Sequence, residues 1–401
     1  MSRVVVVTGA SQGVGRATAR AFAERGDRVA LIARDDDGLA AALDEARALA
    51  PDALAAPADV ADAGAVDAAA AAVEEGLGPI DVWVNAAMAS VFSPVAQLTA
   101  DEVRRVAEVT YLGSVNGTLA ALGRMLPRDR GRIVQVGSAL AYRAIPLQAA
   151  YCAAKFAIRG FTDSLRCELL RDGSRVTVTS VHLPALNTPQ FEVVRTRLPR
   201  HPRPVPPIYQ PEVAARAIVS AADRGGRERW VGRSTIATIV AERLAPPLLD
   251  RYLARTGYDA QQTGEPVPAD RPDNLDAPLP GDRGAHGRFD GAAAPVSRTA
   301  WAREHLDLIA AGAAARRPLP RPDEREGAAE RRAGRPRPRR LPGHAAARRP
   351  RRARPLRRCG RAGQPHRVGA RAPRPDRRRR RPRDRGLDRP PLISTWTEPR
   401  A

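Results

Sequence analysis

Thr8-Gly9-Ala10-Ser11-Gln12-Gly13-Val14-Gly15 is the stretch of sequence that decides the fold. The run Val4-Val5-Val6-Val7 before it is typical of a buried parallel strand, and an amphipathic stretch follows over residues 16–25. In such a strand, turn and helix, glycines let the backbone approach a phosphate, and the helix N-terminus supplies free N–H groups. The pattern predicts a cradle for a nucleotide diphosphate, with an ordinary tight turn as the alternative.

The chain has 66 basic residues, and only one of them is a lysine, Lys155. It ends the motif Tyr151-Cys152-Ala153-Ala154-Lys155, whose spacing puts the phenol and the ammonium on one face of a helix. An ammonium beside a phenol lowers the phenol's pKa, so the tyrosine can exchange a proton with an alcohol or a carbonyl. We therefore predict that both residues are catalytic. Taken singly, a core tyrosine and a solvated lysine are the alternatives.

Ser138 follows the predicted strand 132–137 and precedes Tyr151 by thirteen residues. With the glycine motif and Tyr-x-x-x-Lys, it resembles the short-chain dehydrogenase/reductase family over about residues 1–232. The resemblance implies an α/β fold, a single doubly wound Rossmann domain with about seven parallel strands. It also implies an oxidoreductase that transfers hydride between a nicotinamide dinucleotide and a small-molecule carbonyl or secondary alcohol.

The resemblance implies roles for individual residues. Ser138 would orient the carbonyl oxygen, Tyr151 would be the acid and base, and Lys155 would bind the nicotinamide ribose and tune the tyrosine. The family's fourth catalytic residue, an asparagine, falls at Thr110, so the resemblance leaves the route of proton supply open. Met88 and Leu183-Pro184 also depart from the family pattern and leave the pocket's shape open. The cofactor-binding positions are Gly9, Ser11, Gly13, Val14, Gly15, Arg34, Asp59, Val60, Asn85, Ala86, Lys155 and Thr188.

Arg34 follows Ala33 at the end of the predicted second strand, about twenty residues past the glycines. An acid here would bind a free ribose 2′-hydroxyl, whereas an arginine accommodates a 2′-phosphate. The sequence therefore favours NADP(H) over NAD(H) as the cofactor. Asp35, Asp36 and Asp37 follow at once and would weaken the arginine's field, and a solvated loop arginine is the alternative.

The net positive charge lies at the C-terminal end of the chain. Residues 316–401 contain 30 arginines, 15 prolines and 8 acids, and their net charge of +22 equals that of the whole chain. Such a composition cannot bury enough apolar surface to fold, so it predicts a disordered tail. An out-of-frame reading of GC-rich DNA would also produce it. A tail that contacts nucleic acid is a further alternative, which the lack of interleaved aromatic residues disfavours.

We expect three regions: a Rossmann domain over 1–232 with a substrate loop at 189–211, an ordered extension packing on the core over 233–315, and the tail over 316–401. The three cysteines have no metal-binding spacing, and the chain shows no secretory signal and no run of 18 apolar residues. These features predict a cytoplasmic protein without metal or membrane contact.

By resemblance, we expect a homodimer or homotetramer formed through helices at 101–126 and 149–170. The alternative to an active enzyme is a catalytically weak nucleotide-binding scaffold, which the departures at Thr110 and Met88 motivate.

Overall fold

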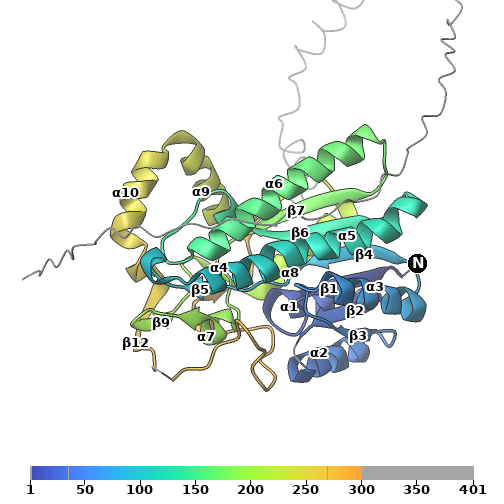
Figure 1. Ribbon diagram of the computed structural model, residues 1–401, viewed down its shortest axis with the longest axis horizontal. Coiled ribbons are helices and arrows are strands. Elements are labelled where there is room, and N and C mark those ends of the chain that lie inside the picture. The colour runs from blue at the N-terminus through green and yellow to red at the C-terminus, as the bar shows by residue number, and fades with distance from the viewer. Residues whose placement is uncertain (1, 35, 269, 300–401) are drawn as a thin grey trace, which may run out of the picture. The chain divides into compact units, whose positions relative to one another are not determined.

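Seven parallel strands form the main sheet of the computed structural model, which describes residues 2–34, 36–268 and 270–299 (Figure 1). In chain order they are β1 (Val4–Thr8), β2 (Arg28–Ala33), β3 (Leu54–Pro57), β4 (Ile80–Asn85), β6 (Arg132–Ser138), β7 (Thr177–Leu183) and β11 (Glu228–Trp230). Across the sheet the order is β11-β7-β6-β4-β1-β2-β3. The chain moves outward in opposite directions on the two sides of the β1–β4 pair, and α/β sheets bind ligands at such a point. The predicted fold is confirmed.

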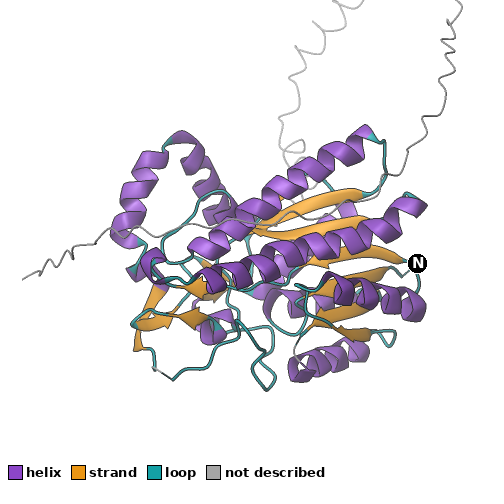
Figure 2. Cartoon of the chain, in the orientation of Figure 1, coloured by secondary structure: helices purple, strands orange, loops and turns teal. Residues whose placement is uncertain are grey.

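Helices cover both faces of the sheet (Figure 2). One face carries α1 (Gly13–Ala23), α2 (Asp36–Leu49) and α8 (Pro211–Arg224). The opposite face carries α3 (Ala63–Leu77), α5 (Gly113–Met125) and α6 (Ala149–Arg171).

Alternate side chains of β1 enter two apolar cores, one on each face. Val5 and Val7 pack with α1, α2 and α8, whereas Val4 and Val6 pack with α3, α5 and α6. All four valines are fully buried, as expected for a strand with helices on both sides. The run before the glycine turn therefore fixes that turn at the carboxyl edge of a rigid sheet.

A π-helical stretch, Ala107–Leu112, interrupts the helical segment that leads into α5. It follows α4 (Ala100–Val106), whose start is fixed by a capping box in which Thr99 and Glu102 exchange hydrogen bonds. π-Helical insertions are frequent at functional sites. This one holds Thr110, a residue predicted to be catalytic.

Beyond β11, α9 (Arg233–Leu244) and α10 (Pro246–Thr256) meet at Pro246, where the sequence predicts a helix break. β12 (Gln262–Pro266) then pairs antiparallel with β9 (Arg200–Pro202), and β13 (Ala293–Ala294) pairs parallel with β10 (Ile208–Tyr209). Two further short elements after β7 are α7 (Gln190–Val193) and β8 (Arg195–Thr196), and β8 pairs with β5 (Val91–Phe92). Residues 233–299 thus pack against the segment predicted to be the substrate loop.

Leu275 anchors the later part of this extension. Its side chain is 1% exposed and belongs to the apolar core beneath α3 and α5. The predicted tail, residues 316–401, and residues 300–315 of the predicted extension lie outside the described residues. Within the described part of the chain, no helix combines the length and the hydropathy needed to cross a membrane.

Candidate active site

The glycine turn between β1 and α1 has no space for a side chain at two positions. A Cβ on Gly9 would lie 2.7 Å from the Cα of Ala87, and a Cβ on Gly15 would collide with the carbonyl oxygen of Gly9. Gly9 and Gly13 also have positive φ angles, 68° and 59°, which residues with side chains rarely adopt. The turn therefore presents backbone to its surroundings, which fits the pyrophosphate of a dinucleotide.

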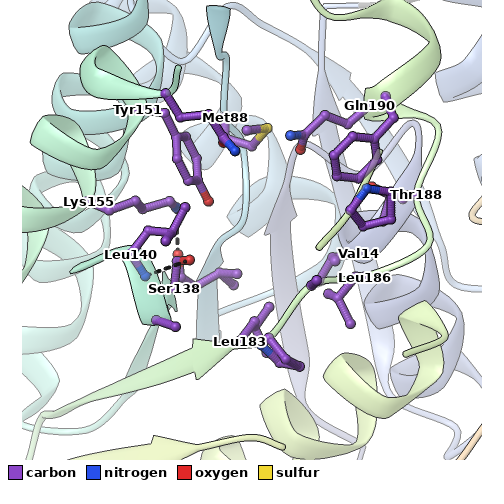
Figure 3. Close-up of a pocket in the computed structure, with 18 of the residues that line it drawn as sticks. Val14, Met88, Ser138, Leu140, Tyr151, Lys155, Leu183, Leu186, Thr188 and Gln190 are labelled. Atoms are coloured by element: carbon purple, nitrogen blue, oxygen red, sulfur yellow. Dashed lines mark hydrogen bonds between the residues drawn. The ribbon is translucent and has the colours of Figure 1, made fainter. Parts of the chain in front are cut away.

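A cavity of about 500 Å³ lies at the carboxyl edge of the sheet (Figure 3). Most of the predicted site residues line it: Gly9, Ser11, Gly13, Val14, Gly15, Arg34, Asp59, Val60, Ala86, Ser138, Tyr151, Lys155 and Thr188. Asn85 and Thr110 are the two predicted residues that are not among its lining residues. The structure thus brings the predicted cofactor and catalytic positions to one cavity.

Asn85 supports the cavity from behind. Its side-chain oxygen accepts a hydrogen bond from the Trp83 indole at 2.8 Å, and its amide donates to the Thr118 hydroxyl at 3.0 Å. The residue is 2% exposed and ties β4 to α5. The following residue, Ala86, reaches the cavity.

Thr110 acts on the loop after β4 through its side chain. Its hydroxyl accepts a hydrogen bond from the N–H of Ala89 and donates one to the carbonyl of the same residue, both at 2.9 Å. The Thr110 carbonyl in turn accepts a hydrogen bond from the Ser114 hydroxyl. Thr110 is fully buried, so it holds the loop that contains Met88 rather than facing the cavity itself.

Ser138 and Tyr151 face each other across the cavity wall (Figure 3). Ser138 is the last residue of β6, and its hydroxyl accepts a hydrogen bond from the N–H of Leu140 at 3.1 Å. The Tyr151 phenol, which comes from the first turn of α6, points toward Ser138. Two hydroxyl groups therefore converge at the place where a carbonyl oxygen could bind.

Lys155 lies one helical turn beyond Tyr151 and is 4% exposed. Its Nζ donates a hydrogen bond to the carbonyl oxygen of Val136 at 2.7 Å and lies 5.5 Å from the centre of the Tyr151 ring. Burial lowers the pKa of this ammonium to about 8. The lysine is thus held against β6, behind the two hydroxyl groups.

The pKa of Tyr151 shifts in the direction opposite to the sequence-based expectation. Burial raises the pKa of the phenol above its ordinary value, and the nearby Ser138 side chain offsets only part of that increase. The ammonium of Lys155 is directed to the Val136 carbonyl, so it does not reverse the effect of burial. The phenol of Tyr151 is therefore protonated at neutral pH.

Arg34 lines the cavity and is tethered to the extension. Its guanidinium donates to the carbonyl oxygens of Asn274 at 3.0 Å and Asp276 at 3.2 Å, and it lies 3.9 Å from the carboxylate of Asp59. Burial alone would raise the pKa of Asp59, but hydrogen bonds from the Ala61 N–H and from an arginine of α4 bring it below its usual range. Asp59 is therefore ionised and moderates the positive field of Arg34.

Sequence reasoning missed His182, which lies behind Ser138. Its Nδ1 is 3.2 Å from the Ser138 carbonyl oxygen, and its imidazole packs edge-on against the ring of Tyr142. Burial lowers the pKa of His182 to about 4, so it is neutral at pH 7. A histidine inside the otherwise apolar end of β7 is the signal that could have identified it.

The extension also contributes to the cavity, which sequence reasoning did not specify. Helices α9 and α10 line one part of it, and Asn274 and Arg283 line another. Within residues 2–34, 36–268 and 270–299, no cluster of three or more His, Cys, Asp or Glu side chains could hold a metal ion.

Comparisons with known proteins agree with this geometry. The family model described as short chain dehydrogenase matches residues 3–198. The uncharacterized oxidoreductase YxnA of Bacillus subtilis is 35% identical over 271 residues, which cover 66% of this chain and 75% of that protein. This chain belongs to the short-chain dehydrogenase family. Members of this family use a nicotinamide cofactor, so the protein is an enzyme of NAD(P)-dependent oxidoreduction.

Two further proteins are similar to this short-chain dehydrogenase over comparable lengths. The putative oxidoreductase SadH of Mycobacterium tuberculosis is 34% identical over 260 residues, 63% of this chain and 94% of that protein. A solved alcohol dehydrogenase from the archaeon Thermococcus sibiricus, complexed with 5-hydroxy-NADP, is similar with a TM-score of 0.50 and 26% identity. The match covers 58% of this chain and 95% of that structure. Enzymes of the short-chain dehydrogenase family typically act on small molecules and form oligomers.

Proposed function

We propose that this enzyme transfers hydride between NADP(H) and a carbonyl or secondary alcohol group, with Ser138, Tyr151 and Lys155 as its catalytic residues. The observation that carries the proposal is the convergence of the Ser138 and Tyr151 hydroxyls at the cavity wall, with the Lys155 ammonium buried behind them. Nicotinamide dinucleotide, when bound, supplies or accepts the hydride.

In the direction of reduction, each residue has a separate task. Ser138 donates a hydrogen bond to the carbonyl oxygen and fixes its position. Tyr151 gives its proton to that oxygen as negative charge develops there. Lys155 then stabilises the resulting phenolate, since its ammonium lies 5.5 Å from the ring centre. In the oxidation direction, the phenolate of Tyr151 accepts the proton of the alcohol.

We assign the cofactor as NADP(H) on the basis of Arg34. Arg34 lines the cavity directly after β2, where an arginine accommodates a 2′-phosphate. The residue before it is Ala33, so β2 ends without the carboxylate that would favour a free 2′-hydroxyl. The solved relative with an NADP analogue supports the same assignment.

The cavity near Tyr151 favours an apolar substrate. Leu140, Ile145, Leu249, Leu253 and Phe191 are among the residues that line the cavity together with Tyr151. Two arginines also reach it. Arg143 is paired with carboxylates of α9 and α10, and Arg203 donates a hydrogen bond to the carbonyl of Ala260. A charged keto acid would therefore have to compete for arginines that already have partners.

The experiment is cofactor oxidation with two matched panels of ketones. Apolar cyclic and long-chain ketones should oxidise NADPH, and α-keto acids of the same carbon number should do so at least tenfold more slowly. Turnover of keto acids alone would refute the apolar assignment. Binding of NADPH without turnover of any ketone in either panel would instead support the catalytically weak scaffold.

We also propose that the enzyme forms a dimer or tetramer through α4, α5 and α6. These helices expose apolar side chains to solvent, including Leu119 at 57%, Phe156 at 41% and Leu170 at 74%. Exposed apolar side chains grouped on neighbouring helices are typical of a subunit interface. Light scattering should give at least twice the mass of the chain, and the charged substitution Leu119→Glu should reduce it. A wild-type monomer would refute the proposal.

A further inference from the structure

We propose that Arg283, in the extension, binds a phosphate group of the nicotinamide dinucleotide. The assignment rests on the proposed cofactor site and adds to it a residue from outside the segment 3–198 that matches the family. It is carried by the position of Arg283 beside the glycine turn, by the anchoring of the residues around it, and by the charge of its surroundings.

The backbone on both sides of Arg283 is fixed to the start of α1. The carbonyl oxygen of Gly284 accepts a hydrogen bond from the N–H of Gly13 at 3.1 Å. Asp282 forms an ion pair with Arg16, whose side chain is only 4% exposed and which also pairs with Glu45 at 2.8 Å. Residues 282–284 are therefore held against the glycine turn that cradles the cofactor.

A further hydrogen bond fixes Gly281, the residue before this segment. The N–H of Gly281 donates to the carboxylate of Asp37, in the first turn of α2, at 2.8 Å. The segment around Arg283 is therefore attached to α1 and α2, the helices that follow β1 and β2. An arginine fixed in this way loses little further backbone freedom when it binds an anion.

The side chain of Arg283 lines the cavity together with Gln12, Gly13 and Arg34. It is half-buried, and its guanidinium donates a hydrogen bond to the carbonyl of Pro280 at 3.3 Å. Among residues 2–34, 36–268 and 270–299, no carboxylate forms an ion pair with it. Most of its five N–H donors remain for a ligand in the cavity.

Arg283 differs from the other basic residues around it in lacking an acidic partner within the described part of the chain. It borders a small surface hollow with Arg16, Arg20 and His286, and Arg20 pairs with Glu24 at 3.2 Å. Glu45 and Asp282 are engaged by Arg16, and His286 lies between Glu212 at 2.8 Å and Asp290 at 2.9 Å. The acids therefore have partners of their own.

Arg283 also precedes the residue that contacts the start of α1, which is the positive end of that helix's dipole. A guanidinium beside a helix N-terminus is unfavourable unless an anion lies between them. The pyrophosphate of the dinucleotide would bind at this helix start, and a 2′-phosphate would bind near Arg34. Arg283 shares the cavity with both places, so the shared chemistry is a phosphate of the cofactor.

The test is titration of the full-length protein with NADPH and with NADH, followed by nucleotide fluorescence. Arg283→Gln should weaken NADPH binding roughly tenfold or more, because a charge-assisted hydrogen bond to phosphate contributes about 1.5–3 kcal/mol. An equal loss for NADH would assign the pyrophosphate, and a loss confined to NADPH would assign the 2′-phosphate. The control is Arg255→Gln, which removes an exposed arginine of α10 that does not line the cavity.

A second readout separates phosphate binding from a structural role. If Arg283 binds phosphate, the dissociation constant of wild type should rise more steeply with salt than that of Arg283→Gln. Arg283→Lys should keep the salt dependence, because it keeps the charge. Equal affinities and equal salt dependence in wild type and Arg283→Gln would overturn the assignment alone. Failure of wild type to bind either dinucleotide would overturn the proposed function and the assignment with it.

Discussion

The hydroxyl of Thr110 and the main chain of Ala89 are joined by two hydrogen bonds of 2.9 Å, one to the N–H and one to the carbonyl of the same residue. A side chain that satisfies both groups of one residue fixes the orientation of that peptide. Ala86, Ala87 and Met88 lie on the cavity just before this fixed point. The π-helical stretch thus affects the shape of the cavity in two ways, since Thr110 holds this loop and Val109 lines the cavity directly.

Thr110→Val should lower the free energy of unfolding by about 1–3 kcal/mol, because it leaves the buried N–H and carbonyl of Ala89 without that partner. It should also weaken cofactor binding, since the loop that begins at Ala86 becomes less rigid. Chemical denaturation and cofactor titration measure the two effects. Thr110→Ser keeps the hydroxyl and should retain most of both properties. A valine variant as stable as wild type would show that the two hydrogen bonds are dispensable.

Tyr151→Phe should reduce kcat by roughly 100-fold to 10,000-fold, the range expected for loss of a general acid, and leave the Kd for NADPH nearly unchanged. The substitution removes the proton donor and keeps the ring that packs at the cavity wall. Steady-state kinetics and cofactor titration check the two statements. Tyr258→Phe is the matched control, because Tyr258 is 46% exposed and does not line the cavity. Substantial turnover by Tyr151→Phe would remove this tyrosine from the mechanism.

Burial of Lys155 should make stability depend on pH. Its pKa is about 8 in the folded protein and 10.5 as the ordinary value, so between these values the unfolded chain binds more protons. The free energy of unfolding should therefore gain about 2 kcal/mol from this group as pH rises from roughly 7.5 to 9.5. The gain is obtained by measuring the free energy of unfolding in urea at both pH values, for wild type and for Lys155→Gln. It is the rise with pH in wild type minus the rise with pH in the variant. A variant with the same pH dependence as wild type would mean that the lysine is not penalised by burial.

Arg34→Ala should change cofactor preference. The substitution removes a 2′-phosphate partner, so affinity for NADPH should fall roughly tenfold or more. It also releases the carbonyls of Asn274 and Asp276, and this release should affect NADPH and NADH equally. The ratio of the two dissociation constants is therefore the informative quantity. An unchanged ratio would place the determinant of cofactor preference elsewhere.

The parts of the molecule that the sequence predicts well depend on local patterns. Four consecutive valines, a glycine turn and an amphipathic stretch specify β1, the cradle and α1, because each is set by neighbouring residues. The grouping of Ser138, Tyr151 and Lys155 was predictable because one residue ends a parallel strand and the others share a helix face.

The parts that sequence reasoning missed depend on contacts between distant segments or on main-chain partners. A π-helical insertion leaves no mark in the apolar pattern, and the partner of Thr110 is a peptide rather than a side chain. The direction of the Tyr151 pKa shift depends on how deeply the fold buries the phenol, which the spacing to Lys155 does not report. The position of Arg283 depends on the hydrogen bond between Gly13 and Gly284, which lie far apart in the sequence. Gly284 belongs to a segment rich in proline and glycine.

The hydrogen bond between Gly13 and Gly284 has a consequence for the synthesis of the protein on the ribosome. A ribosome adds roughly 5–20 residues per second, so about 15–55 s pass between synthesis of the first glycine and of the second. During that time the growing chain contains β1, the glycine turn and α1, but it lacks the segment around Gly284 that packs against them. The cavity that Arg283 lines is therefore complete only after Gly284 has been synthesised, well after the glycine turn itself.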